Sequence, residues 1–343
     1  MQCKKENLNG MSLPLLFEIR EKQLVLNYKD SFDRYVEGCR FYGRFFVEVI
    51  RARSRIFLSE ITIEVFPSLK QSIIKKRFNQ NEFDFLNSFE RGGSVEVVKT
   101  LKKLGVQIDI QFENDNVKDQ FTNIKGNFIL SNHQHELDTF MQALFPQNHH
   151  WGAKANLLQY PLFGKVLGKG EPIVFYRGDT KKGQIKKRAS EIVTKLQKSE
   201  NVAIFFEGTR TFTGEIGDNR DLASVYTSKL MSEVEEIAKE KNFKVKKLFV
   251  VLKTFDSFSN IGNLDKKSSG SAITKSNISK LKEILASTRF KNNRIVLHIY
   301  GDRNFTYHYS EDEDENNIFG FFRKKVKEIV IEDILSHQDK AVR

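Results

Sequence analysis

Short, continuous apolar runs alternate with helix-length segments through most of the chain, and this pattern constrains the fold more than any other feature. Apolar runs of this length indicate strands buried on both faces of a sheet, with the intervening helices covering those faces. The runs are Phe128 to Leu130, Ile173 to Phe175, Val202 to Phe206, Leu248 to Leu252 and Ile295 to Tyr300. The sequence therefore predicts an α/β fold with a mixed, mostly buried sheet flanked by helices.

A further strand is expected at residues 106–112, ahead of these runs. Apolar residues alternate there with polar ones, which predicts a half-buried strand. The alternating residues are Val106, Ile108, Ile110 and Phe112. The helix before this strand should bury Val98 and Leu101 and end at Gly105, because glycine readily adopts the left-handed conformation that ends helices.

The segment "RGGS", residues 91–94, is the clearest domain boundary. Paired glycines interrupt the pattern, and Ser94 can cap the helix that follows. Residues 1–92 are therefore predicted to form a mainly helical N-terminal domain, in which apolar residues such as Phe46 and Ile50 recur at helical spacing. Residues 93–343 are predicted to form the α/β domain.

Cysteine content and hydropathy indicate in which cellular compartment the protein works. The two cysteines, Cys3 and Cys39, cannot form a disulfide framework, and no Cys/His cluster has the spacing of zinc ligands. No uncharged apolar run approaches the roughly 18 residues that cross a bilayer. Glu18 and Arg20 interrupt the apolar segment that a secretion signal would need. We therefore expect a cytoplasmic protein without a structural metal.

The chain is strongly basic, with a formal net charge of +12. Such a charge favours nucleic acid, an anionic membrane surface, or acidic proteins and phosphate-bearing ligands as partners, and it does not choose among them. The sequence lacks an aromatic RNA-binding motif, a zinc finger and a helix-turn-helix. A non-enzymatic nucleic-acid-binding protein is therefore an alternative without a supporting motif.

The stretch "ILSNHQHELDTF", residues 129–140, ends an apolar run with two histidines and an aspartate. Residues five apart lie about 140° apart around a helix, so His133 and Asp138 would not share one helix face. We therefore place His133 in the strand-to-helix turn and Asp138 in the first turns of the helix. There the aspartate fixes the histidine tautomer, and the other ring nitrogen can take a proton from a hydroxyl as a general base.

A hydrolase acting on a thioester or lipid ester is the alternative, with Ser131 as the nucleophile beside His133. No Gly-x-Ser-x-Gly elbow surrounds Ser131. Such an enzyme would act without an acceptor alcohol.

A second group of candidates follows the next central run. "FFEGTR", residues 205–210, leads a buried strand into a loop with a glycine for close backbone approach and a guanidinium for bidentate contact with phosphate. Arg210 is a candidate phosphate clamp, or alternatively it forms an ion pair with Glu207 that holds the loop. Lys154 and Arg177 add cations near the same edge, since ligands gather beyond the carboxyl ends of strands in α/β sheets.

Together these motifs resemble the glycerolipid acyltransferases that share a His-x4-Asp motif, the PlsC-like lysophosphatidic acid and glycerol-3-phosphate acyltransferases. The resemblance runs from about Gly93 to about Arg303. It rests on four segments in matching order, "NHQHELD", "KANLLQYPLFGKVLGKGEPIVFYR", "FFEGTR" and "VLHIYGD". It implies the acyltransferase fold for this part of the chain.

The resemblance also implies an activity. A fatty acyl group would move from acyl-CoA or acyl carrier protein to a hydroxyl of 1-acylglycerol-3-phosphate or glycerol-3-phosphate in phospholipid synthesis. His133 would deprotonate the hydroxyl and Asp138 would orient His133. The substrate phosphate would bind near Lys154, Arg177, Glu207, Gly208, Thr209 and Arg210. No cofactor or metal is expected.

Two positions depart from the family pattern, and both remove positive charge beside the phosphate site. Phe212 stands where arginine is common and Glu215 where lysine is common, so the branch of the family stays open. A basic cluster follows Arg177, at Lys181, Lys182, Lys186, Lys187 and Arg188. It is either a solvated helix face or a contact for an acidic carrier, for coenzyme A phosphates or for anionic lipid. We expect peripheral association with the cytoplasmic face of the membrane.

Overall fold

The computed structural model describes most of the α/β region and little of the chain before it. The described residues are 8–11, 16, 44, 47, 51, 98–99, 101–103, 105–133, 138–141, 144–145, 149–159, 171–176, 182–208, 223–254, 294–308 and 313–341. The predicted N-terminal helical domain, residues 1–92, lies almost wholly outside them, and the boundary at residue 93 stays a prediction.

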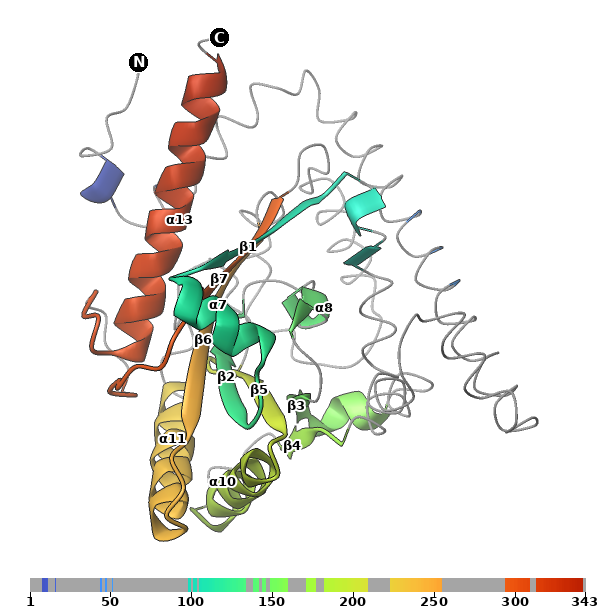
Figure 1. Ribbon diagram of the computed structural model, residues 1–343, viewed down its shortest axis with the longest axis vertical. Helices are drawn as coiled ribbons and strands as arrows, with labels where there is room; N and C mark the ends of the chain where they lie inside the picture. The colour runs from blue at the N-terminus through green and yellow to red at the C-terminus, as the bar shows by residue number, and fades with distance from the viewer. Residues whose placement is uncertain are drawn as a thin grey trace, which may run out of the picture.

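The described elements alternate between strands and helices along the chain (Figure 1). In order they are β1 (Gln107–Phe112), α7 (Asp115–Thr122), β2 (Asn127–Ser131), α8 (Asp138–Met141), β3 (His149–Lys154), the 3-10 helix η3 (Ala155–Gln159), β4 (Ile173–Phe175), α10 (Lys182–Gln197), β5 (Asn201–Phe205), α11 (Ala223–Glu240), β6 (Lys246–Thr254), β7 (Arg294–Tyr300) and α13 (Ile318–Ala341). Among the helices described, none is both long and apolar enough to cross a membrane.

The described strands form one seven-stranded sheet in the order β1-β7-β6-β2-β5-β3-β4. From β6 to β4 every neighbouring pair is parallel. β7 runs antiparallel to β6, and β1 runs parallel to β7. The predicted mixed α/β sheet is confirmed. Because β2, β3, β4, β5 and β6 run the same way, their carboxyl ends share one edge of the sheet.

Each central strand sends alternate side chains to two cores on opposite faces of the sheet, as the period of two requires. In β2, Phe128 and Leu130 belong to one core and Ile129 to the other. The first core is covered by α10, α11 and α13, and the second by α7, Met141 of α8 and Phe145. The central strands are therefore buried on both faces, as their continuous apolar runs predicted.

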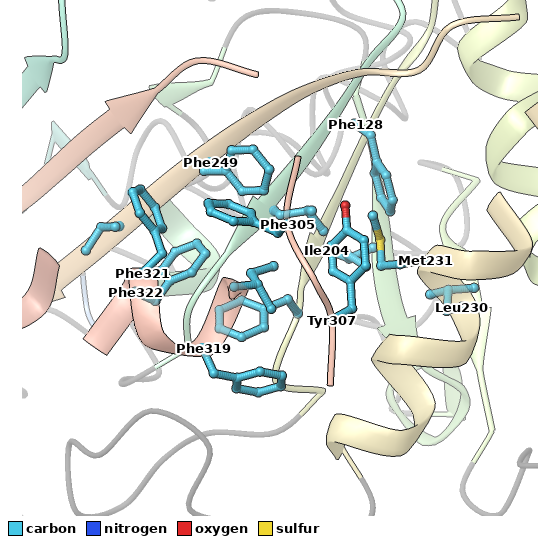
Figure 2. Close-up of a cluster of buried hydrophobic side chains, with 14 of the residues drawn as sticks. Phe128, Ile204, Leu230, Met231, Phe249, Phe305, Tyr307, Phe319, Phe321 and Phe322 are labelled. Atoms are coloured by element: carbon cyan, nitrogen blue, oxygen red, sulfur yellow. The ribbon is translucent and has the colours of Figure 1, made fainter. Parts of the chain in front are cut away.

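Aromatic rings dominate the first core where α13 meets the sheet. Figure 2 shows Phe249 of β6 beside Phe305, with Phe321 and Phe322 of α13 next to them. The ring centroids of Phe249 and Phe305 are 4.7 Å apart at 74°, and those of Phe305 and Phe321 are 5.0 Å apart. Edge-to-face and tilted pairs of this kind add specific contact energy to the burial of apolar area. They fix α13 against β6.

The predicted apolar runs match β2, β4, β5, β6 and β7 to within two residues at each end. β3 was not among them, because its sequence, "HHWGAK", is only partly buried and contains no apolar run. β1 is an edge strand, so Ile110, predicted to face inward, is 38% exposed. Gly105 has φ +89° and stands where the preceding helix ends, with Leu101 buried, as predicted.

The half-buried His298 of β7 makes the stability of the fold depend on pH. Burial lowers the pKa of its imidazole from 6.5 to about 4, and the cations Arg294 and Lys325 act in the same direction. Between these values the unfolded chain binds a proton at His298 that the folded chain does not. The free energy of unfolding should therefore fall as the pH decreases from 6.5 to about 4.

We expect this contribution to be on the order of 1 kcal/mol, because solvent screens a half-buried ring. Urea unfolding at pH 7 and pH 5 should show a smaller difference in His298→Gln than in the wild-type chain. The same substitution at the exposed His308 should leave the difference as it is. An equal difference in all three proteins would rule out this assignment to His298.

Candidate active site

His133 and Asp138 meet at the edge of the sheet where β2 ends. His133 lies two residues after β2, and Asp138 is the first residue of α8. The Nδ1 atom of His133 is 3.2 Å from Oδ2 of Asp138. The Asp138 side chain is 0% exposed and that of His133 is 13% exposed. The predicted placement, histidine before the helix and aspartate in its first turn, is confirmed.

This pair sets the tautomer of the imidazole. A carboxylate only accepts hydrogen bonds, so Nδ1 carries a proton and its N–H donates a hydrogen bond to Asp138. Nε2 is then the basic nitrogen of the ring. The arrangement suits proton transfer from a hydroxyl to Nε2, while the buried carboxylate stabilises the imidazolium that forms.

The ring of His133 also stacks on Phe205, the last residue of β5. The two ring centroids are 4.0 Å apart and the planes are 13° from parallel. The register places Ser131 of β2 directly beside Phe205. The parallel pairing of the two strands therefore brings the face of Phe205 under the histidine that follows β2.

Glu207 holds the backbone of the same histidine from the turn after β5. The N–H of His133 donates to Oε1 of Glu207 at 2.9 Å, and Glu207 is 2% exposed. Gly208 follows with φ +65°, and its N–H donates to the carbonyl of Phe205. A side chain at Gly208 would strain this turn, since that φ favours glycine. Sequence reasoning grouped Glu207 with the phosphate-binding residues and missed this contact with His133.

Asn132, which the sequence analysis did not single out, fixes the turn to β6. Its Nδ2 donates to the carbonyl of Leu252 at 2.9 Å, and the Leu252 N–H donates to its Oδ1 at 2.6 Å. The side-chain amide thus replaces a backbone peptide and extends the ladder between β2 and β6 by one step. An asparagine directly after a buried strand and before the candidate base was the available signal.

The candidate phosphate-binding residues are described only in part. Lys154 is the exposed last residue of β3, and it pairs in register with Phe175 of β4 at the same edge as His133. Glu207 and Gly208 follow β5 at this edge. Arg177, Thr209 and Arg210 lie outside the described residues, so their predicted roles stay predictions.

The described residues also bear on two other kinds of site, that of a serine hydrolase and that of a metal ion. Ser131, the nucleophile of the hydrolase alternative, is 1% exposed and lies within β2, between β5 and β6. Within the described part of the chain, no group of three or more His, Cys, Asp or Glu side chains is arranged to hold a metal ion.

Comparison with protein families identifies the domain that contains this site. The family model described as Acyltransferase matches residues 109–227, which include His133, Asp138 and Glu207. The matched segment runs from β1 into α11, so the chain contains a domain of the acyltransferase family, as the motifs predicted.

One solved structure similar to the chain is 1-acyl-sn-glycerophosphate (LPA) acyltransferase, PlsC, from Thermotoga maritima. It is 13% identical in sequence, and the match covers 84% of this chain and 97% of that chain with a TM-score of 0.33. The comparison with curated proteins gives no match.

The Asn132 contacts predict an effect on turnover without a direct role in chemistry. Asn132→Ala removes both hydrogen bonds to Leu252, so the turn that carries His133 loses its tie to β6. We expect kcat to fall roughly 10- to 100-fold, the order of loss that small misplacement of a reacting group causes. Steady-state acyl transfer by folded protein measures it.

Asn127→Ala is the matched control, because it truncates a buried asparagine at the other end of the same strand. It should change thermal stability without a comparable loss of kcat. Equal losses of kcat in the two variants would assign the effect of Asn132 to general destabilisation of β2.

Proposed function

We propose that this acyltransferase moves a fatty acyl group from acyl-CoA or acyl carrier protein to a hydroxyl of a glycerol-phosphate acceptor in phospholipid synthesis. The acceptor is 1-acylglycerol-3-phosphate or glycerol-3-phosphate. The observation that carries the proposal is the 3.2 Å contact between His133 Nδ1 and Asp138 at the carboxyl edge of the sheet, inside the segment that matches the acyltransferase family.

In this mechanism Nε2 of His133 takes the proton of the acceptor hydroxyl as its oxygen attacks the thioester carbonyl. The tetrahedral adduct then collapses, the carbon–sulfur bond breaks, and the leaving thiolate takes the proton from the imidazolium. Asp138 supports the positive charge on His133 between the two steps. Atoms and charge balance without a cofactor or metal, in line with the proposal that the enzyme needs neither.

The acceptor phosphate is proposed to bind beyond β3, β4 and β5. Lys154 supports this, because this exposed residue ends β3 at the edge that also carries His133. Arg177, Thr209 and Arg210 complete the proposed site by the motif resemblance. Glu207 takes part indirectly, since its carboxylate already accepts from the backbone of His133. Glycine at position 208 allows the turn that follows β5, since its φ is +65°.

We further propose that the enzyme works at the cytoplasmic face of the membrane. The net charge of +12 favours an anionic lipid surface. Lys186 and Lys187 of α10 are exposed and add cations to the helix that follows β4. The same charge suits an acidic carrier protein or the phosphates of coenzyme A, so the donor is either of these.

Thiol release from palmitoyl-CoA tests the proposed reaction. The purified chain should release thiol when glycerol-3-phosphate or 1-acylglycerol-3-phosphate is present, and the acceptor that supports release identifies the branch of the family. His133→Ala should lower kcat by a factor of roughly 10² to 10⁴, the contribution of a general base. Equal release without acceptor would favour the hydrolase alternative.

Asp138→Asn separates orientation of the base from its presence. The amide can donate to Nδ1 and so favours the wrong tautomer of His133, and we expect a loss of kcat of similar order with little change in KM. The exposed His308→Ala is the control for histidine removal and should keep full activity. Wild-type kcat in Asp138→Asn would contradict the assignment of Asp138.

A further inference from the structure

We propose that Phe205 is a positioning residue for the general base, and that its ring stabilises the imidazolium of His133 during acyl transfer. This inference rests on the proposed function, since it assigns a role to Phe205 in the reaction at His133. The observation behind it is the parallel stack of the two rings, 4.0 Å between centroids and 13° between planes.

Phe205 stacks on a face of the imidazole, so the two ring nitrogens stay available to other groups. Asp138 contacts the ring at Nδ1, whereas Phe205 covers one face of it. A ring held at one nitrogen can still turn about the line through that contact. The flat contact with Phe205 removes this freedom and so fixes the direction in which Nε2 points.

The stack has an electrostatic consequence as well. The face of a phenyl ring is negative, so it attracts a cation placed above it. His133 is neutral before it takes the hydroxyl proton and positive afterwards. Phe205 therefore favours the protonated ring over the neutral one, which is the change that occurs as the acceptor is activated.

Charged groups near His133 act beside this stack. Asp138 lies against Nδ1 from α8, and the Glu207 carboxylate binds the backbone N–H from the turn after β5. Lys154 lies at the same edge of the sheet, at the end of β3. The variants that test Phe205 must therefore leave all three of these charged residues unchanged.

The position of Phe205 in the strand is consistent with this role. Its neighbours Ile204 and Phe206 belong to the core beneath α10, α11 and α13, whereas Phe205 packs half-buried beside the opposite core, on the face of α8. This face also contains the buried Met141 of α8. The alternation of the strand thus directs Phe205 toward the helix that carries Asp138.

The test replaces the phenyl ring of Phe205 and leaves the charged residues around His133 unchanged. Phe205→Leu and Phe205→Met remove the aromatic face, and Phe205→Tyr keeps it. The pKa of His133 is measured by NMR titration of the histidine ring protons, with the His133 signal identified by its loss in His133→Gln. In parallel, kcat and KM for acyl transfer from palmitoyl-CoA are measured across pH.

Loss of a cation–π contact at a partly exposed site should lower the pKa of His133 by roughly 0.4 to 0.7 pH unit. We expect the acidic limb of the kcat profile to move to lower pH by the same amount in Phe205→Leu and Phe205→Met. The plateau of kcat should fall roughly three- to tenfold with KM within about twofold. Phe205→Tyr should restore the wild-type pKa and profile.

Phe112→Leu is the matched control. Phe112 is also a half-buried phenylalanine packed against the same core, but it lies on the edge strand β1 and contacts Phe121. It should leave the pKa of His133 and the pH profile unchanged. A His133 pKa that is unchanged in both Phe205→Leu and Phe205→Met overturns the proposal, whatever happens to kcat.

The result separates this inference from the proposed function. If the wild-type chain shows no acceptor-dependent thiol release, the proposed reaction is wrong, and the NMR titration still decides whether Phe205 stabilises the protonated ring. If Phe205→Leu does not fold, Phe205→Met decides in its place.

Discussion

The parallel pairing of β2 with β5 on one side and β6 on the other is the constraint on which the site depends. β2 leads into His133, and β5 ends at Phe205 and leads into Glu207. β6 supplies the Leu252 peptide that holds Asn132. The registers are fixed because both faces of these strands are buried, and a slip of one residue would exchange the faces. The positions of the polar groups therefore follow from the burial of apolar ones.

Two buried carboxylates converge on one residue, and this explains how the site tolerates them. Burying a carboxylate is costly unless hydrogen bonds compensate for the lost water. Asp138, 0% exposed, accepts from the ring of His133, and Glu207, 2% exposed, accepts from its backbone N–H. The same contacts that satisfy the two anions hold His133 from two directions. In the proposed mechanism this arrangement lowers the reorganisation needed in the transition state.

Three consecutive residues, Phe205, Phe206 and Glu207, connect the aromatic core to the candidate active site. Phe205 faces His133, whereas Phe206 turns to the opposite face and packs against Phe319 and Phe322 of α13. The Phe206 N–H donates to the carbonyl of Ser131, which extends the pairing with β2 to the residue before Glu207. The aromatic core under α13 and the position of His133 are thus linked through a single segment of backbone.

The sequence by itself determined the mixed α/β class, five of the strands in the sheet and the approach of His133 to Asp138. Continuous apolar runs indicate doubly buried strands, because a strand covered on both faces has no side chain in contact with water. The five-residue separation between His133 and Asp138 placed one residue before a helix and the other inside it. β3 and the contacts of Asn132, Phe205 and Glu207 were decided only by tertiary structure. Their partners are distant in the sequence, 74 residues away for Glu207 and 120 for Asn132. Local spacing carries no information about which strands become neighbours, and strand order is set by the packing of the whole sheet.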